Sequence, residues 1–74
     1  MESYRGASVE WWNDSKPGLV ALRIDPQTSR FALFANDTGM PIAVCAGAMG
    51  RKVDFITNGV INGNWTGVII TAVN

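Results

Sequence analysis

The chain has 74 residues, of which 47% are hydrophobic and 16% are charged, and six basic and six acidic side chains give it a formal net charge of zero. This length leaves room for one domain, because a second hydrophobic core could not be filled. With one cysteine and no histidine, the chain cannot form an internal disulfide, a zinc site of the usual Cys/His type or a catalytic pair with a histidine base. The neutral charge argues against nucleic acid as a partner, because binding a phosphate backbone requires concentrated lysine and arginine.

Short apolar runs alternate with clusters of turn-forming residues about every ten residues, a pattern typical of barrels and sandwiches. We therefore predict an all-β fold, a small antiparallel barrel or sandwich of about six short strands. Residues 1–7 are expected to be a flexible N-terminal arm, and residues 8–74 a single β domain. The predicted strands cover residues 8–12, 19–24, 30–35, 42–46, 52–57 and 65–73.

The first predicted strand contains the neighbouring residues Trp11 and Trp12. Adjacent side chains of a strand point to opposite faces, so one ring is expected in the core and the other is available to a partner or ligand. The strand ends before Pro17-Gly18, a pair that fits the central positions of a type II turn. A hairpin to the strand at residues 19–24 is predicted there, followed by an alternating strand at residues 30–35.

The run Ile42-Ala43-Val44-Cys45-Ala46 has no polar residue other than the cysteine. Such a run is predicted to be a strand buried on both faces. Cys45 is then expected to act as a small core hydrophobe, because an apolar environment raises a thiol pKa and makes it inert. The glycine-rich stretch that follows, residues 47–50, is interpreted as a hairpin loop.

The C-terminal third contains Asn58-Gly59, a dipeptide that favours a type I′ hairpin turn. In the last strand, Val68 and Ile69 point to opposite faces, so one is expected inside and the other against a neighbouring chain. Trp65 stands between Asn64 and Thr66, polar residues that could flank an exposed ring. The candidate interface or ligand residues are Trp11, Trp12, Trp65, Val68 and Ile69; no catalytic, cofactor-binding or metal-binding residue is predicted.

A core of this size is expected to supply only about 3–5 kcal/mol, so small domains often add disulfides, metals or oligomerisation. With the first two excluded, a homo-oligomer is predicted, most simply a trimer. The high apolar fraction agrees with a chain that covers part of its surface with another chain.

The stretch from Gly50 to Val60, a strand that runs into a Gly-Val turn, resembles small phage capsid-decoration proteins. The resemblance implies a structural protein that oligomerises and cements a larger protein assembly on the virion surface. Because the chain has no histidine and its one cysteine lies in an apolar run, no enzymatic activity is expected. The alternative is a carbohydrate-binding module that uses exposed tryptophans and turn asparagines. A nucleic-acid-binding barrel is the third possibility, and the neutral charge disfavours it.

The first twelve residues lack the basic start and apolar run of a secretory signal, and no stretch approaches the ~18 apolar residues of a membrane span. The expected location is therefore the virion surface if the resemblance holds, and otherwise the cytoplasm. Neither a membrane nor a cofactor is expected as a partner.

Overall fold

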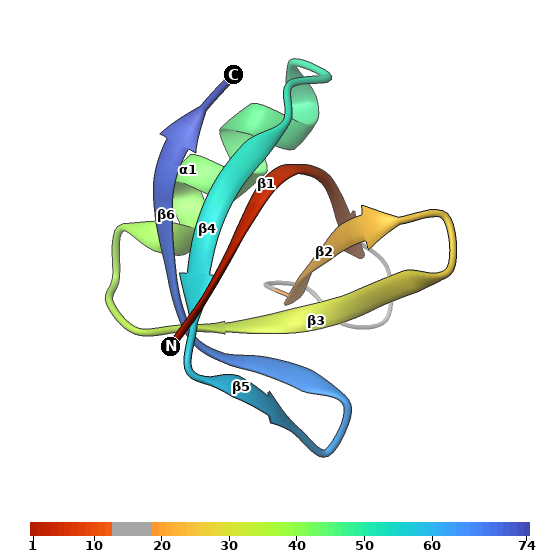
Figure 1. Cartoon of the computed structure of the whole chain (residues 1–74). Coiled ribbons are helices and arrows are strands. Elements are labelled where there is room, and N and C mark those ends of the chain that lie inside the picture. Colours follow the sequence, from red (N-terminus) through yellow and green to blue (C-terminus); the bar gives the residue numbers. More distant parts are fainter. Residues whose placement is uncertain (13–18) are drawn as a thin grey trace.

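The computed structural model describes the backbone of residues 1–12 and 19–74 and, except for Trp11 and Trp12, their side chains. Figure 1 shows a mostly β chain with one short helix inserted between the third and fourth strands. The elements are β1 (Glu2–Trp12), β2 (Leu19–Asp25), β3 (Thr28–Phe34), α1 (Gly39–Ala48), β4 (Val53–Thr57), β5 (Gly59–Ile61) and β6 (Asn64–Val73). The predicted turn at Pro17-Gly18 lies outside the described residues.

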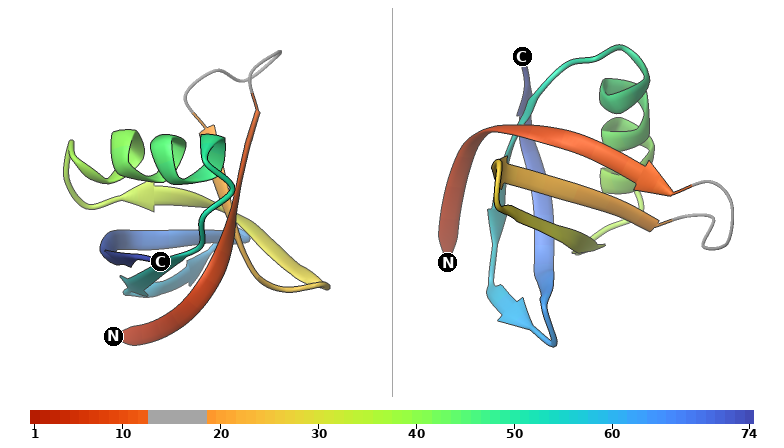
Figure 2. Two further views of the ribbon diagram at one scale, coloured as in Figure 1. Left: turned by 90° about the horizontal axis from the view of Figure 1, so that it is seen from above. Right: turned by 90° about the vertical axis from the view of Figure 1, so that its right-hand side faces the viewer.

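The strands form a closed barrel rather than a sandwich. Their order is β3-β2-β1-β4-β6, and the ends of this order join because β3 also pairs with β6. All neighbouring strands are antiparallel except β3 and β6, which are parallel. The short β5 pairs only with β6 and extends the sheet as a hairpin below the barrel in Figure 1. The helix α1 packs against β1, β2 and β6 (Figure 2).

The strand β1 belongs to both halves of the barrel because it bends sharply near its middle. Its first half pairs with β4 and its second half with β2, with a shift in register between Tyr4 and Ala7. Gly6 has a φ of +70°, which glycine adopts at little cost, and its N–H donates to Asp54 Oδ1 at 2.9 Å. Residues 2–7, which we expected to be a flexible arm, are therefore the first half of a barrel strand.

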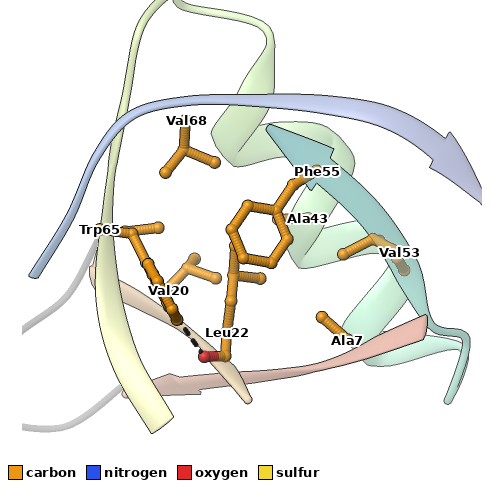
Figure 3. Packing of buried hydrophobic residues seen from close by; sticks show 10 residues of the cluster. Ala7, Val20, Leu22, Ala43, Val53, Phe55, Trp65 and Val68 are labelled. Atoms are coloured by element: carbon orange, nitrogen blue, oxygen red, sulfur yellow. Dashed lines mark hydrogen bonds between the residues drawn. The ribbon is translucent and has the colours of Figure 1, made fainter. Parts of the chain in front are cut away.

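An aromatic cluster fills one end of the barrel interior. The rings of Tyr4, Phe55 and Trp65 lie with their centroids 5.1–5.5 Å apart, a spacing typical of favourable tilted and edge-on contacts. Trp65 Nε1 donates to the backbone carbonyl of Leu22 at 3.1 Å (Figure 3), which satisfies the buried indole. The Arg30 guanidinium lies 5.4 Å from the centroid of the same ring.

A bulge in β6 allows both Trp65 and Val68 to point into the core. Strict alternation would place residues three apart on opposite faces, but Gly67 has a φ of +59° and the pairing with β3 shifts in register beside it. A Cβ at position 67 would lie 2.9 Å from Asn58 Cγ. The bulge therefore requires glycine on both conformational and steric grounds.

Of the two turns that the sequence predicts in the C-terminal region, at Asn58-Gly59 and at Asn62-Gly63-Asn64, the hairpin turn is the second. Asn62 and Gly63 have φ values of 52° and 80°, the pair of positive angles that a type I′ turn needs. The expected turn at Asn58-Gly59 was wrong: Asn58 occupies a bend, and Gly59 already pairs with Thr66 as the first residue of β5. Two Asn-Gly pairs compete here, and only the second is followed by a strand that can pair back.

The apolar run from Ile42 is a helix and not the predicted strand. Asn36 starts it, because its Oδ1 accepts hydrogen bonds from the N–H groups of Thr38 and Gly39 at 3.2 Å. Gly50, with φ of +67°, ends it: Arg51 N–H bonds to Ala46 O, and Gly50 N–H to Gly47 O. This is the Schellman pattern of a helix C-terminus, so the stretch at 47–50 is a helix end and not a hairpin loop.

Candidate interaction surface

The helix α1 is apolar around its whole circumference. None of its ten residues, GMPIAVCAGA, is charged. One side is buried against the barrel through Gly39, Ala43 and Ala46. A helix with no polar side is normally covered on every face, yet the outward side of α1 remains open to solvent.

The open side forms an apolar groove with the end of β6, here called the α1 groove. Its volume is about 290 Å³, and it is lined by Pro41, Ile42, Cys45, Ala46, Met49 and Val73. Three of its large side chains are well exposed: Ile42 at 39%, Met49 at 61% and Val73 at 42%. No lining residue carries a charge, so the groove lacks the convergent polar groups that orient most small-molecule ligands.

The charged residues that flank α1 in the sequence do not line the groove. Asp37 precedes the helix, and Arg51 and Lys52 follow it; all three are exposed. Asp37 lines a separate hollow with Leu19 and Leu33, and Lys52 lines another with Gly6 and Arg23.

Cys45 lies on the open side of the helix and is a free, exposed thiol. The expectation of a core cysteine was wrong because it followed from the strand assignment. In a helix, Ala43 and Ala46 face the barrel and Val44 packs against the core, whereas Cys45 is directed away from it.

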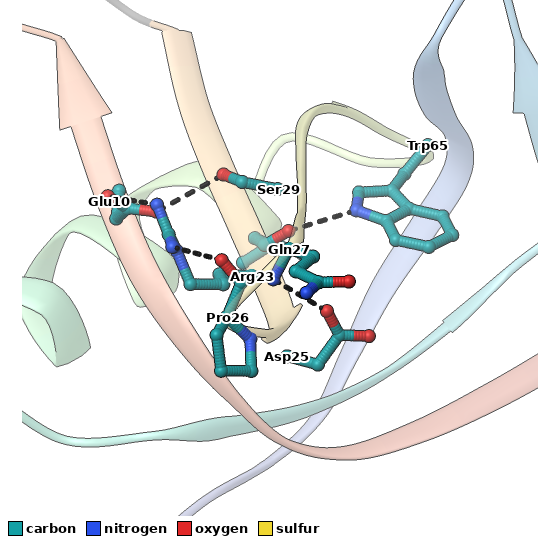
Figure 4. A network of polar contacts seen from close by, with 8 residues as sticks. Glu10, Arg23, Asp25, Pro26, Gln27, Ser29 and Trp65 are labelled. Atoms are coloured by element: carbon teal, nitrogen blue, oxygen red, sulfur yellow. Dashed lines mark hydrogen bonds and ion pairs between the residues drawn. The ribbon is translucent and has the colours of Figure 1, made fainter.

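The outer face of β1, β2 and β3 is the second surface with recognisable chemistry (Figure 4). Arg23 Nε donates to Glu10 Oε1 at 2.8 Å, its NH1 donates to the Pro26 carbonyl, and Ser29 Oγ donates to the same Glu10 oxygen at 3.1 Å. The hydrogen bond from Arg23 lowers the pKa of Glu10, and the bond to Glu10 raises the pKa of Arg23. The guanidinium is thus already paired within the chain.

The structure separates the five residues that the sequence suggested for an interface or ligand. Trp65 and Val68 are core residues, 2% and 0% exposed, so neither is a surface residue; the Gly67 bulge turned both inward. Ile69 is 36% exposed on the outside of β6. The structure does not describe the side chains of Trp11 and Trp12.

The groove residues Ile42, Cys45 and Met49 were missed by sequence reasoning. Their signal was present as a run without polar residues, but the run was taken for a strand. At helical spacing these residues fall on one side, at i, i+3 and i+7.

Within residues 1–12 and 19–74, no group of three or more Cys, Asp or Glu side chains is placed to hold a metal ion. None of the helices in this part of the chain is long and apolar enough to cross a membrane.

Comparison with known proteins found no matching family model, no matching curated protein and no matching solved structure. The topology alone is informative. A five-stranded Greek-key barrel of this strand order, with a helix between its third and fourth strands, has the arrangement of the OB-fold, which supports binding of many unrelated ligands.

Proposed function

We propose that this protein is a structural interaction module that attaches through the α1 groove to a protein surface within a larger assembly. The observation that carries the proposal is the uncharged helix α1, which is covered by the barrel on one side only. Ile42, Met49 and Val73 together present an apolar patch that no element of residues 1–12 or 19–74 covers.

The total accessible surface of the chain is that expected for a stable monomer, so a partner is needed for one apolar patch and not because the core as a whole is too small. The chain exposes 4574 Å², close to the about 4,500 Å² that scaling predicts for a monomer of this mass. The chain therefore buries about as much of its surface as an ordinary monomer of this mass. The requirement for a partner rests on the α1 groove, because apolar side chains covered there contribute about 25 cal/mol for each Å² removed from water.

A capsid-decoration role is one form of this function, suggested by the sequence resemblance. Decoration of a particle needs a compact, rigid domain with an apolar contact patch and no chemistry of its own. The closed barrel and the α1 groove supply the domain and the patch.

The carbohydrate alternative is weakened because Trp65, the ring placed between Asn64 and Thr66, is buried and its Nε1–H is already bonded. Nucleic acid is also disfavoured, although OB-fold barrels often bind it with their second and third strands. A groove that binds the backbone of a nucleic acid needs positively charged side chains that are not already paired. On the outer face of β2 and β3, Arg23 is paired with Glu10.

The test is site-specific photo-crosslinking in the cells or particles that naturally contain the protein. A photoreactive residue is introduced at Ile42 in the groove or, as a matched control, at Ile61 on β5, which is also exposed. Crosslinks to protein from position 42 but not from position 61 are expected. Equal crosslinking at both positions, or none at either, refutes the proposal.

A further inference from the structure

We propose that Asn62 is a site of spontaneous chemical modification, at which the side chain loses its amide and an aspartate or isoaspartate residue forms. The site lies at the tip of the β5–β6 hairpin, which projects from the barrel at the end remote from α1 (Figure 1). It shares no residue with the α1 groove, so this proposal and the proposed function stand or fall separately.

The reaction needs an asparagine and a following backbone nitrogen that can reach its side chain. The nitrogen of the next residue gives up its proton to solvent and attacks Cγ of the asparagine. The Cγ–Nδ2 bond then breaks, the leaving nitrogen takes up a proton, and ammonia departs from a cyclic succinimide. Water opens the ring at one of its two carbonyls, which gives aspartate or, where the main chain now runs through Cγ, isoaspartate. A following glycine favours the attack, because it has no Cβ to hinder rotation of the backbone.

The chain contains two pairs that meet this requirement, Asn58-Gly59 and Asn62-Gly63. Both asparagines are exposed, so access to water does not distinguish them. They differ in what holds the glycine whose nitrogen must attack.

The fold holds Gly59 by both of its backbone polar groups. Its N–H donates to Thr57 Oγ1 at 3.2 Å, and its carbonyl accepts a hydrogen bond from the Thr66 hydroxyl at 3.0 Å. Asn58 is held as well, because its N–H donates to Thr66 O at 2.8 Å. Attack on Asn58 therefore requires Gly59 to leave both Thr57 and its place in β5.

Gly63 has no comparable restraint. Its N–H makes no hydrogen bond to any residue in the ranges 1–12 and 19–74, and its carbonyl has only a long contact, 3.5 Å, with Arg30 NH1. A Cβ built at this position would meet nothing within 4 Å. Asn62 and Gly63 form the turn itself and take no part in the pairing of β5 with β6. The nitrogen that must attack Asn62 is therefore unpaired, with open space around it.

This difference in hydrogen bonding predicts a difference in rate. The hydrogen bond from Gly59 N–H must break before that nitrogen can attack, which alone should slow the reaction at Asn58 by about fivefold. The pairing of Gly59 with Thr66 slows it further, because the edge of β5 must also separate from β6. Modification should therefore fall mainly on Asn62.

The two products affect the hairpin differently. Each adds a carboxylate to a chain whose formal net charge is zero. Aspartate keeps the length of the main chain and is accepted in a type I′ turn, whereas isoaspartate lengthens the main chain within a two-residue turn. The turn leads directly into Trp65, which pairs with Ala32 where β3 and β6 close the barrel. The isoaspartate form should therefore be the less stable of the two.

The first experiment is incubation of the intact chain in mildly alkaline buffer, followed by proteolysis and tandem mass spectrometry with electron-transfer fragmentation. This method assigns each conversion to one residue and separates aspartate from isoaspartate. Conversion at Asn62 should be at least about fivefold faster than at Asn58. In guanidinium chloride, where Gly59 loses its hydrogen bonds, the two rates should become similar. Equal rates in the folded chain, or no conversion at Asn62 while the denatured chain reacts, would overturn the proposal.

The second experiment tests why Asn58 is spared. Thr57→Val removes the acceptor of the Gly59 N–H, so the rate at Asn58 should rise relative to that at Asn62 in the same molecule. Thr57→Ser keeps the hydroxyl and should leave the ratio unchanged. Val20→Ala is the matched control for lost stability, because Val20 is buried on β2. A ratio that does not move in Thr57→Val, or that moves equally in Val20→Ala, would contradict protection by this hydrogen bond.

The third experiment compares the stability of the two products. Ion exchange isolates the isoaspartate form after incubation, and Asn62→Asp supplies the aspartate form with an ordinary main chain. The isoaspartate form should unfold at a lower urea concentration than Asn62→Asp. Equal midpoints would show that the turn tolerates the longer main chain and would refute the expected effect on the hairpin.

Discussion

The glycine at the bulge of β6 should be among the most sensitive positions of the barrel. In Gly67→Ala, the new side chain must adopt a φ of +59°, which costs about 1–2 kcal/mol for a residue with a Cβ. The Cβ would also lie 2.9 Å from Asn58 Cγ, and displacing that side chain from its rotamer costs about 0.5–1.5 kcal/mol. The free energy of unfolding should therefore fall by about 2–3 kcal/mol.

The assay is urea unfolding followed by far-UV circular dichroism. With an m-value of about 1 kcal/mol/M for a domain of this size, the midpoint should fall by about 2–3 M. Gly63→Ala is the matched control, because its φ is +80° and a Cβ there meets nothing within 4 Å. It should lose only the backbone contribution, about 1–2 kcal/mol.

A double-mutant cycle separates the steric contribution from the backbone contribution. Asn58→Ala removes the atoms that a Cβ at position 67 would meet, so it should recover about 1 kcal/mol when combined with Gly67→Ala. The reasoning about the bulge is refuted if Gly67→Ala is no more destabilising than Gly63→Ala, or if Asn58→Ala recovers nothing.

Three further changes test other parts of the structure. Thr57→Val removes the buried hydroxyl that donates to Thr66 O at 2.6 Å and accepts from Gly59 N–H, so chemical denaturation should show a loss of about 1–3 kcal/mol that Thr57→Ser avoids. The N–H of Gly6, followed by the Asn74 amide, holds the pKa of Asp54 below its usual 3.8. The contribution of ionised Asp54 to stability is therefore complete above pH 3.8 and is lost as the pH falls through the lower pKa of the folded state. The free energy of unfolding of Asp54→Asn, measured by chemical denaturation, should depend less on pH below 3.8 than that of the unmodified protein. Cys45 should react with Ellman's reagent in native buffer, because its thiol is free and exposed; a thiol that reacts only in denaturant would contradict that position.

Strands of the barrel could be predicted from the sequence because the patterns that indicate them are local. Residues 19–24 and 30–35 alternate and are bounded by turn-forming residues, and they match β2 and β3 within two residues at each boundary. Closure of the barrel by the parallel pairing of β3 with β6 could not be predicted from the sequence. It depends on which chain ends meet in space, and nothing in residues 28–34 or 64–73 alone specifies it.

The two bulges explain why individual side chains were harder to place than strands. Strict alternation along residues 65–73 would place Trp65 and Val68 on opposite faces, and a single left-handed glycine, Gly67, puts them on the same face. Gly6 acts similarly in β1, where it turns an expected loose arm into a strand shared by two sheets. A glycine inside a strand is a sign of such a feature, but its conformation is decided by the neighbouring strand.

The error at residues 39–48 is instructive because its cause is also the functional signal. Helix indicators were present: Asn36 before the run, Pro41 in the first turn, several alanines, and Gly50 after the end. They were outweighed because a run that is apolar on every side has no helical periodicity to detect. An isolated barrel would need polar residues on the outside of such a helix. Their absence from α1 is explained if the outside is covered by another chain.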